Sequence, residues 1–99
     1  MTYQDVMDLL EDIDEENFIE KTTDSKSKCC AAGHINRLLS SNPNDYSYKN
    51  CTAFDENKPA YPFVMEGLTK ANDAFFLEYK EYPIKERVMK WLNKKNTEL

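Results

Sequence analysis

Apolar residues recur at helical spacing in four stretches of the chain, and these stretches predict most of its secondary structure. They span residues 3–13, 28–41, 61–71 and 83–95. A shorter helical turn is expected at 15–20. The side chains that we expect on the buried faces of the four helices are Val6, Leu9, Leu10, Ile13, Ala31, Ile35, Leu38, Leu39, Phe63, Val64, Leu68, Ala71, Ile84, Val88, Trp91 and Leu92.

Residues near the helix ends support these boundaries. Thr2, three positions before Asp5, is suited to cap the first helix, and Ser27 is a candidate cap for the second. Pro83 suits the first turn of the last helix. Gly33 lies inside the second helix, where glycine costs about 1 kcal/mol relative to alanine. We therefore expect another part of the backbone to pack closely against Gly33.

Three segments do not follow the helical pattern. Residues 22–28 are polar and predict a surface loop. Residues 46–60 are compatible with either a short strand or an extended loop, and residues 75–79 are the best strand candidate. A chain of 99 residues is one domain's length. The prediction is one domain over 1–99, mainly α or α+β, with about four to five helices and at most a small β element.

Charge is distributed unevenly along the chain, whose net charge is −5. Residues 1–20 contain eight acidic and no basic side chains, whereas residues 80–95 contain six basic and two acidic ones. The basic residues are confined to one predicted helix and form no broad groove, so we do not expect direct nucleic-acid binding. The acidic run is either a solvated helix face or a surface that docks on a basic partner. Its candidate binding residues are Asp12, Asp14, Glu15 and Glu16.

Three cysteines, an odd number that includes two neighbours, make a poor disulfide framework and indicate a reducing compartment. No apolar run reaches the roughly 18–20 residues that cross a bilayer. The first residues lack the basic and apolar parts of a secretion signal. We therefore expect a cytoplasmic protein without a membrane partner.

Cys30 and His34 are four residues apart and would share one face of a helix. Cys29 and Cys30 lie near a predicted helix N-terminus beside Lys26 and Lys28, an arrangement that lowers a thiol pKa. These features allow a cysteine nucleophile with a histidine base. The alternative is that the cysteines are buried and pack as small apolar side chains, which we favour because nucleophile and base usually come from different elements. Zinc bound by the cysteines and the histidine does not fit the usual ligand spacing, so we expect no metal and no cofactor.

Tyr46 and Tyr48 are candidates for a contact surface or for stacking on a base. The chain has only Gly33 and Gly67, so it lacks a glycine-rich loop that could cradle phosphates. Nucleotide hydrolysis of the common kinds is therefore not expected, but a nucleotide could still bind.

Two short motifs carry a resemblance to a known family. Cys30-Ala31-Ala32-Gly33 precedes apolar helix positions, and Asn72-Asp73-Ala74 precedes the last amphipathic helix. In this order they resemble a family of small uncharacterised phage and bacterial proteins, over about half of the chain. The resemblance implies a phage-like origin and a packing role for Cys30, Gly33, Asn72 and Asp73. A small Gly33 would let the 72–74 turn approach the helix, where an Asn72 or Asp73 side chain can bond backbone groups.

These observations favour a binding protein over an enzyme. The leading hypothesis is a small phage-type accessory protein that binds a host protein or other host macromolecule and inhibits or redirects it, for example a counter-defence inhibitor in the host cytoplasm. One alternative is a sponge that binds a small nucleotide signal. Another is a cysteine-dependent enzyme that uses Cys30, or Cys29, with His34. A homo-oligomeric assembly subunit is the remaining possibility.

Overall fold

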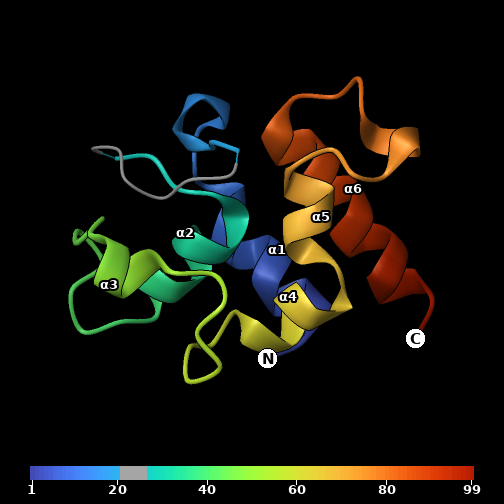
Figure 1. The fold of residues 1–99 in the computed structure, drawn as a ribbon. Coiled ribbons are helices and arrows are strands. Elements are labelled where there is room, and N and C mark those ends of the chain that lie inside the picture. The colour runs from blue at the N-terminus through green and yellow to red at the C-terminus, as the bar shows by residue number, and fades with distance from the viewer. Residues whose placement is uncertain (21–26) are drawn as a thin grey trace.

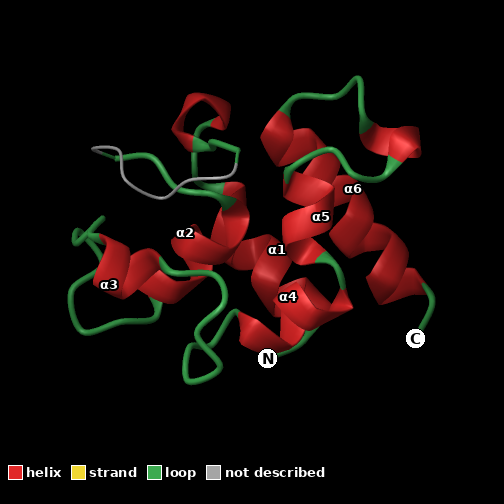
Figure 2. Cartoon of the chain, viewed as in Figure 1, coloured by secondary structure: helices red, strands yellow, loops and turns green. Residues whose placement is uncertain are grey.

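Six short α-helices and two 3-10 helices make up the computed structural model, which describes residues 1–20 and 27–99 (Figure 1). The α-helices are α1 (Tyr3–Glu11), α2 (Ala31–Leu38), α3 (Tyr48–Cys51), α4 (Tyr61–Glu66), α5 (Leu68–Asn72) and α6 (Ile84–Thr97), and the 3-10 helices are η1 (Glu15–Asn17) and η2 (Leu77–Tyr79). The described residues contain no strand (Figure 2), and an isolated parallel bridge joins Phe18 to Cys29. The predicted mainly α fold is confirmed.

The helices are arranged around α1 and α5. Each of these two helices packs against both α2 and α6, while α3 packs against α2 and α4 against α5. In Figure 1, α2 and α3 therefore lie on one side of the molecule and α6 on the other. η1 contacts α6, which brings the acidic N-terminal segment next to the basic C-terminal helix.

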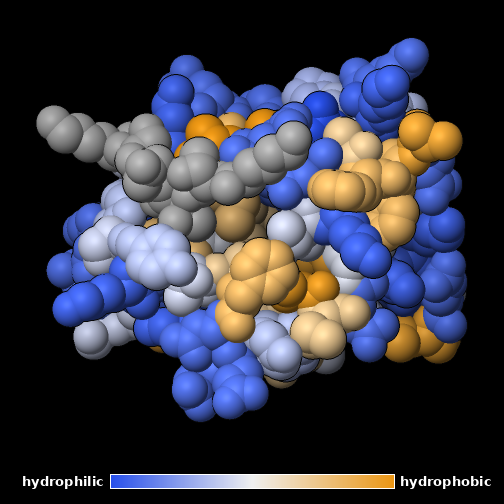
Figure 3. Space-filling model, in the orientation of Figure 1, coloured by the Kyte–Doolittle hydropathy of each residue, from blue (hydrophilic) through white to orange (hydrophobic). Residues whose placement is uncertain are grey.

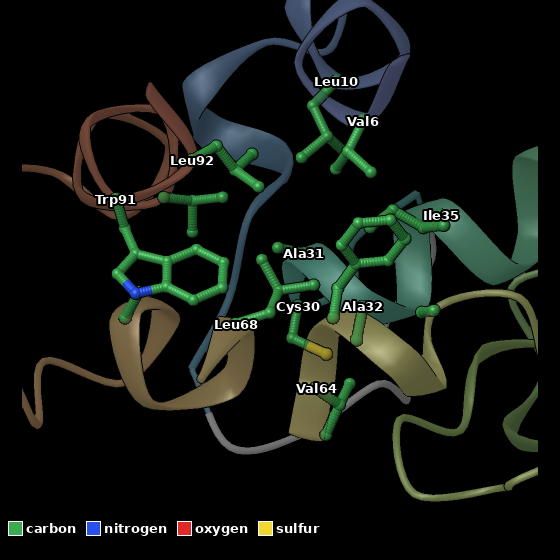
Figure 4. Close-up of a cluster of buried hydrophobic side chains, with 14 of the residues drawn as sticks. Val6, Leu10, Cys30, Ala31, Ala32, Ile35, Val64, Leu68, Trp91 and Leu92 are labelled. Carbon is green, nitrogen blue, oxygen red and sulfur yellow. The ribbon is translucent and has the colours of Figure 1, made fainter. Parts of the chain in front are cut away.

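The buried side chains form one hydrophobic core to which every larger helix contributes (Figure 4). Val6 and Leu10 from α1, Ile35 from α2, Leu68 from α5 and Leu92 from α6 are all fully buried. Each such side chain stabilises the fold by about 1.5–3 kcal/mol. Because several of the helices are shorter than two turns, this shared core rather than intrinsic helix propensity holds them in place.

The ends of α1 follow from its sequence. Thr2 Oγ1 accepts a hydrogen bond from the backbone N of Asp5 at 3.1 Å, and Asp5 Oδ2 accepts one from the backbone N of Thr2 at 2.8 Å. This reciprocal capping box confirms the predicted N-cap. The helix ends at Glu11, two residues before its predicted end.

α2 is shorter than predicted at both ends. Its N-cap is Cys30 and not Ser27, which has a φ of 65° outside the helix. The backbone N of Ala31 finds its partner in Asn72 Oδ1 at 2.9 Å, so a distant side chain fixes the helix start. Leu39 is the C-cap and is 46% exposed, which contradicts its expected burial. The helix has ended by then, and Leu39 no longer follows its periodicity.

The predicted helix over 61–71 is divided into α4 and α5 by Gly67. Gly67 has a φ of +122°, a conformation that L side chains rarely adopt. The segment 46–60, for which a strand or an extended loop was considered, contains the single helical turn α3. These two features explain why the structure has more helices than the four to five that were expected.

The strand expected at 75–79 is wrong. Ala74 has a φ of 61° and turns the chain out of α5, and η2 follows at Leu77–Tyr79. Phe76 is half-buried and Tyr79 is buried, whereas Phe75 and Leu77 are exposed. Inward side chains three residues apart fit a 3-10 turn and not the two-residue period of a strand.

α6 is the longest helix, with 14 residues, and begins just after Pro83, which takes the N-cap position. No helix in the described part of the chain is long and apolar enough to span a bilayer. The polar loop expected at 22–28 lies mostly outside the described residues, which resume at 27.

Candidate functional site

The three cysteines gather at the N-terminal end of α2, where all of them are buried. Cys29 Sγ donates to Cys51 Sγ across 3.2 Å. Cys30 Sγ instead accepts from the backbone N of Gly33 at 3.4 Å and so caps α2. The cysteines therefore divide into a facing pair and a capping thiol.

Burial raises the pKa of all three thiols. Desolvation is the largest cause for Cys29, Cys30 and Cys51, and for Cys29 the hydrogen bond to Cys51 adds to it. The expected lowering of the pKa by nearby lysines is therefore wrong for Cys29 and Cys30, and Lys26 lies outside the described residues. A thiol must lose its proton to act as a nucleophile, so in the folded state these surroundings oppose a catalytic role for the cysteines.

His34 is fully buried, and both of its ring nitrogens have partners. Arg37 Nε donates to His34 Nδ1 at 3.1 Å, so the proton is on Nε2, which lies 2.7 Å from the carbonyl oxygen of Asn17 and donates to it. Burial lowers the pKa of His34 to about 4, and the charge of Arg37 acts in the same direction. His34 is thus neutral at pH 7, and it bridges α2 to the end of η1.

The structure does not bring Cys30 and His34 together as nucleophile and base. The sulfur of Cys30 accepts a hydrogen bond from the backbone N of Gly33, and the ring nitrogens of His34 are hydrogen-bonded to Asn17 and Arg37. In the part of the chain that the structure describes, no group of three or more His, Cys, Asp or Glu side chains is placed to hold a metal ion.

At Gly33, α2 approaches its neighbours closely. A methyl group at this position would lie 2.9 Å from Cys29 Cβ and 3.0 Å from the carbonyl oxygen of Cys51. The close approach expected at Gly33 is therefore made to the cysteine pair and not to the 72–74 turn. Glycine is needed here for space, since its backbone is helical.

Asn72 links three parts of the chain. It is fully buried, its Oδ1 accepts from Ala31 N, and its Nδ2 donates to the carbonyl oxygen of Ile19 and to Asp73 Oδ1, each at 2.9 Å. The side chain thereby bonds backbone groups of α2 and of the segment after η1. Asn72 and Asp73 act here as structural residues.

The acidic side chains of residues 12–16 lie at the surface, and we call this segment the acidic ledge. Asp12, Asp14 and Glu16 are exposed, and the structure assigns them no ion pair within residues 1–20 and 27–99. Glu15 differs from them, because its Oε2 accepts from the backbone N of Lys85 at 3.0 Å in the first turn of α6. Three of the four predicted binding carboxylates are thus available to a partner, while Glu15 stabilises a helix start.

Two basic side chains of α6 anchor the chain on either side of the acidic ledge. Lys85 Nζ donates to the carbonyl oxygen of Glu11 at 2.6 Å. Arg87 NH1 pairs with Glu20 Oε1 at 2.8 Å, and Arg87 Nε donates to the carbonyl oxygen of Tyr82 at 2.7 Å. Arg87 therefore ties the segment after the ledge to the connection between α5 and α6.

That connection carries an exposed apolar tip. Phe75 and Leu77 are 67% and 83% exposed, and Tyr82 is 38% exposed. Figure 3 shows hydrophobic atoms over this part of the surface, at the upper right, among hydrophilic ones. We call Phe75 and Leu77 the apolar tip.

Tyr46 lies just before α3 and Tyr48 begins it, and the two rings have different surroundings. The guanidinium of Arg37 lies 4.3 Å from the centre of the Tyr46 ring, and the His34 ring meets Tyr46 edge-on at 6.3 Å. Tyr48 is 70% exposed. One face of Tyr46 is therefore covered by the protein itself, and Tyr48 is the more accessible of the two rings.

A groove of about 340 Å³ lies between α4, α5 and α6. Gly67, Phe76 and Trp91 contribute to its walls, and its charged lining consists of Glu66, Glu78, Glu98, Lys70, Lys94 and Lys95. Lys94 is already paired with Glu78 at 3.3 Å. Equal numbers of acidic and basic groups give the groove no preference for an anion or a cation.

The sequence matches no protein-family model and no curated protein, and the fold matches no solved structure. The functional interpretation of the candidate site therefore depends on the geometry of this protein alone.

Sequence patterns missed two parts of this site. The apolar tip was assigned to a strand, although its position between a turn and Pro83 is also typical of an exposed connection. The pairing of Arg87 with Glu20 joins residues 67 apart, and no local pattern signals it.

Proposed function

We propose that this protein is a small phage-type accessory protein that binds a host protein in the host cytoplasm and inhibits or redirects it. The observation that carries the proposal is the exposed acidic ledge formed by Asp12, Asp14 and Glu16. Exposed carboxylates of one sign attract a basic partner and speed its approach.

The acidic ledge is fixed to the start of α6 by hydrogen bonds. Glu15 and the carbonyl oxygen of Glu11 are both bonded to Lys85, so the carboxylates on either side project from a fixed backbone. A preorganised surface loses less conformational freedom on binding than a flexible one. The ledge therefore has the properties of a docking surface rather than of a solvated tail.

The partner that fits this surface is basic and offers an apolar pocket. The segment after the ledge and the connection with the apolar tip share Arg87 as a bonding partner. Exposed aromatic and aliphatic side chains next to charges are typical of interface anchors, because they bury apolar area while the charges set orientation. Phe75 and Leu77 are the anchors that we assign.

Charge reversal tests the role of the ledge. The variant Asp12→Lys, Asp14→Lys and Glu16→Lys spares Glu15, and the tagged protein is used to capture partners from a host lysate at two salt concentrations. We expect the captured partner to be lost in this variant and weakened by salt in the wild type. Partner capture by the charge-reversed protein at wild-type level would overturn the proposal.

A matched control separates the ledge from net charge. Glu56→Lys, Glu66→Lys and Glu98→Lys change the net charge equally at exposed positions elsewhere, and we expect this control to retain its partner. Equal loss in both variants would show that only overall charge matters. If nucleotides raise the melting temperature while capture is absent, the nucleotide-sponge alternative replaces the proposal.

A further inference from the structure

The side chains of Cys29 and Cys51 face each other in the interior of the protein. Their sulfurs are 3.2 Å apart, and both residues are fully buried. Gly33 keeps them together, because its missing side chain leaves room for the β-carbons of both cysteines, which would lie 2.9 Å and 3.3 Å from a methyl group there. The pair joins positions 22 residues apart in the sequence.

The distance between the two sulfurs is only slightly longer than a covalent disulfide bond. A disulfide has a sulfur–sulfur distance of about 2.05 Å, so the two atoms must approach by roughly 1 Å. The chain around Cys51 is a single helical turn, α3, between two loops, and closing the gap requires α3 to shift slightly toward the segment before α2.

We propose that Cys29 and Cys51 are a reversible redox pair, which a small-molecule disulfide oxidises to an intramolecular disulfide between α3 and the segment before α2. This modification site is independent of the acidic ledge. Cys30 is not part of the pair, because its sulfur is bonded to the backbone N of Gly33.

The reaction is an ordinary thiol–disulfide exchange. Both sulfurs are buried, so the oxidant reaches them when α3, the single helical turn that carries Cys51, opens locally. Cys51 is the first nucleophile, because this opening takes its thiol out of the buried surroundings that raise its pKa. The Cys51 thiolate attacks one sulfur of the oxidant, forms a mixed disulfide and releases one thiolate. Cys29, after losing its proton, attacks Cys51 Sγ and releases the second thiolate. Two protons and two electrons thus pass from the cysteines to the oxidant, which leaves as two thiols.

Peptide mapping of the oxidised native protein tests the pair. The folded wild type is incubated with oxidised glutathione, and remaining thiols are then alkylated under denaturing conditions. After trypsin digestion, Cys29 and Cys30 lie in peptide 29–37 and Cys51 lies in peptide 50–70, because Lys58 precedes a proline. We expect these two peptides to be joined, with the mass of two hydrogen atoms lost, and to separate after reduction.

Three single variants identify the bonded cysteines. Cys30→Ala is the matched control and should still form the cross-link, whereas Cys29→Ala and Cys51→Ala should not. A cross-link that survives in Cys29→Ala, a disulfide between two chains, or a wild type that keeps three alkylatable thiols would each overturn the proposal.

A second measurement needs no variant. Closing the 22-residue loop restricts the unfolded chain, so the oxidised wild type should melt at least about 5 °C above the reduced form. An oxidised protein that melts at or below the temperature of the reduced one would also contradict the proposal, because the bond would then not fit the native fold.

Discussion

Replacing Gly33 by alanine tests whether the close packing around the cysteine pair leaves no room for a side chain at position 33. The added methyl group would lie 2.9 Å from Cys29 Cβ and 3.0 Å from the carbonyl oxygen of Cys51. Neither atom is the end of a flexible side chain, so the backbone of α2 or α3 must move. Overpacking of this kind costs about 1–3 kcal/mol.

A favourable effect opposes this cost. Alanine is better than glycine inside a helix by up to about 1 kcal/mol. We therefore expect Gly33→Ala to lower the free energy of unfolding by a net 1–2 kcal/mol or so, which corresponds to a loss of roughly 5–15 °C in the melting temperature.

Urea unfolding under reducing conditions measures this difference. The fluorescence of Trp91, which is the only tryptophan and is 3% exposed, reports the loss of the core. Asn93→Ala, at an exposed position of α6, is the control in which alanine adds helix propensity without a contact. If Gly33→Ala is as stable as the wild type or more stable, the reasoning from close packing is refuted.

Three other substitutions or conditions have defined outcomes. Asn72→Ala should lower the free energy of unfolding by about 2–4 kcal/mol, because the backbone N of Ala31 and the carbonyl oxygen of Ile19 lose their buried partner; a loss below about 1 kcal/mol in urea unfolding would contradict this. Stability should also fall as the pH drops from about 6.5 to about 4, since in this range the unfolded chain binds a proton at His34 that the folded chain does not. The loss should reach about 3 kcal/mol in urea titrations at several pH values, and an equally steep fall in His34→Gln would assign it to other groups. Arg87→Met should lower the free energy of unfolding by about 1–2 kcal/mol, since the ion pair that it removes is partly exposed, and weaken partner capture by loosening the segment that follows the ledge. Unchanged melting in a thermal-shift assay would count against this anchoring role.

The amphipathic pattern was sufficient to predict the helices that make the core. α1 and α6 differ from the predicted ranges by one or two residues, because capping and apolar spacing are local properties. The boundary of α2 was harder to predict, since its first backbone N is bonded by Asn72, 41 residues away. The expectation of a strand at 75–79 failed because a short apolar run has the same composition in a strand, a buried turn or an exposed connection.

The candidate sites depend on contacts that no spacing rule contains. Cys29 and Cys51 are 22 residues apart, and their pairing follows from how α3 folds back on α2. The acidic ledge was visible as a charge run, but the sequence did not distinguish Glu15, whose side chain accepts a hydrogen bond from α6, from the neighbouring carboxylates. Local patterns identify residue types, and the tertiary fold decides their partners.

Buried asparagines also affect how the molecule exchanges hydrogen with solvent. The amide of Ala31 is held by Asn72, and the amide of Ala60 is held by Asn36 at 2.9 Å. Both amides are buried at the starts of helices, where the first backbone N–H groups lack helical partners and usually exchange fast. We expect them to exchange only when the surrounding core opens. Deuterium uptake at these two positions should therefore report the global unfolding of the protein, although neither amide belongs to a helical hydrogen-bond ladder.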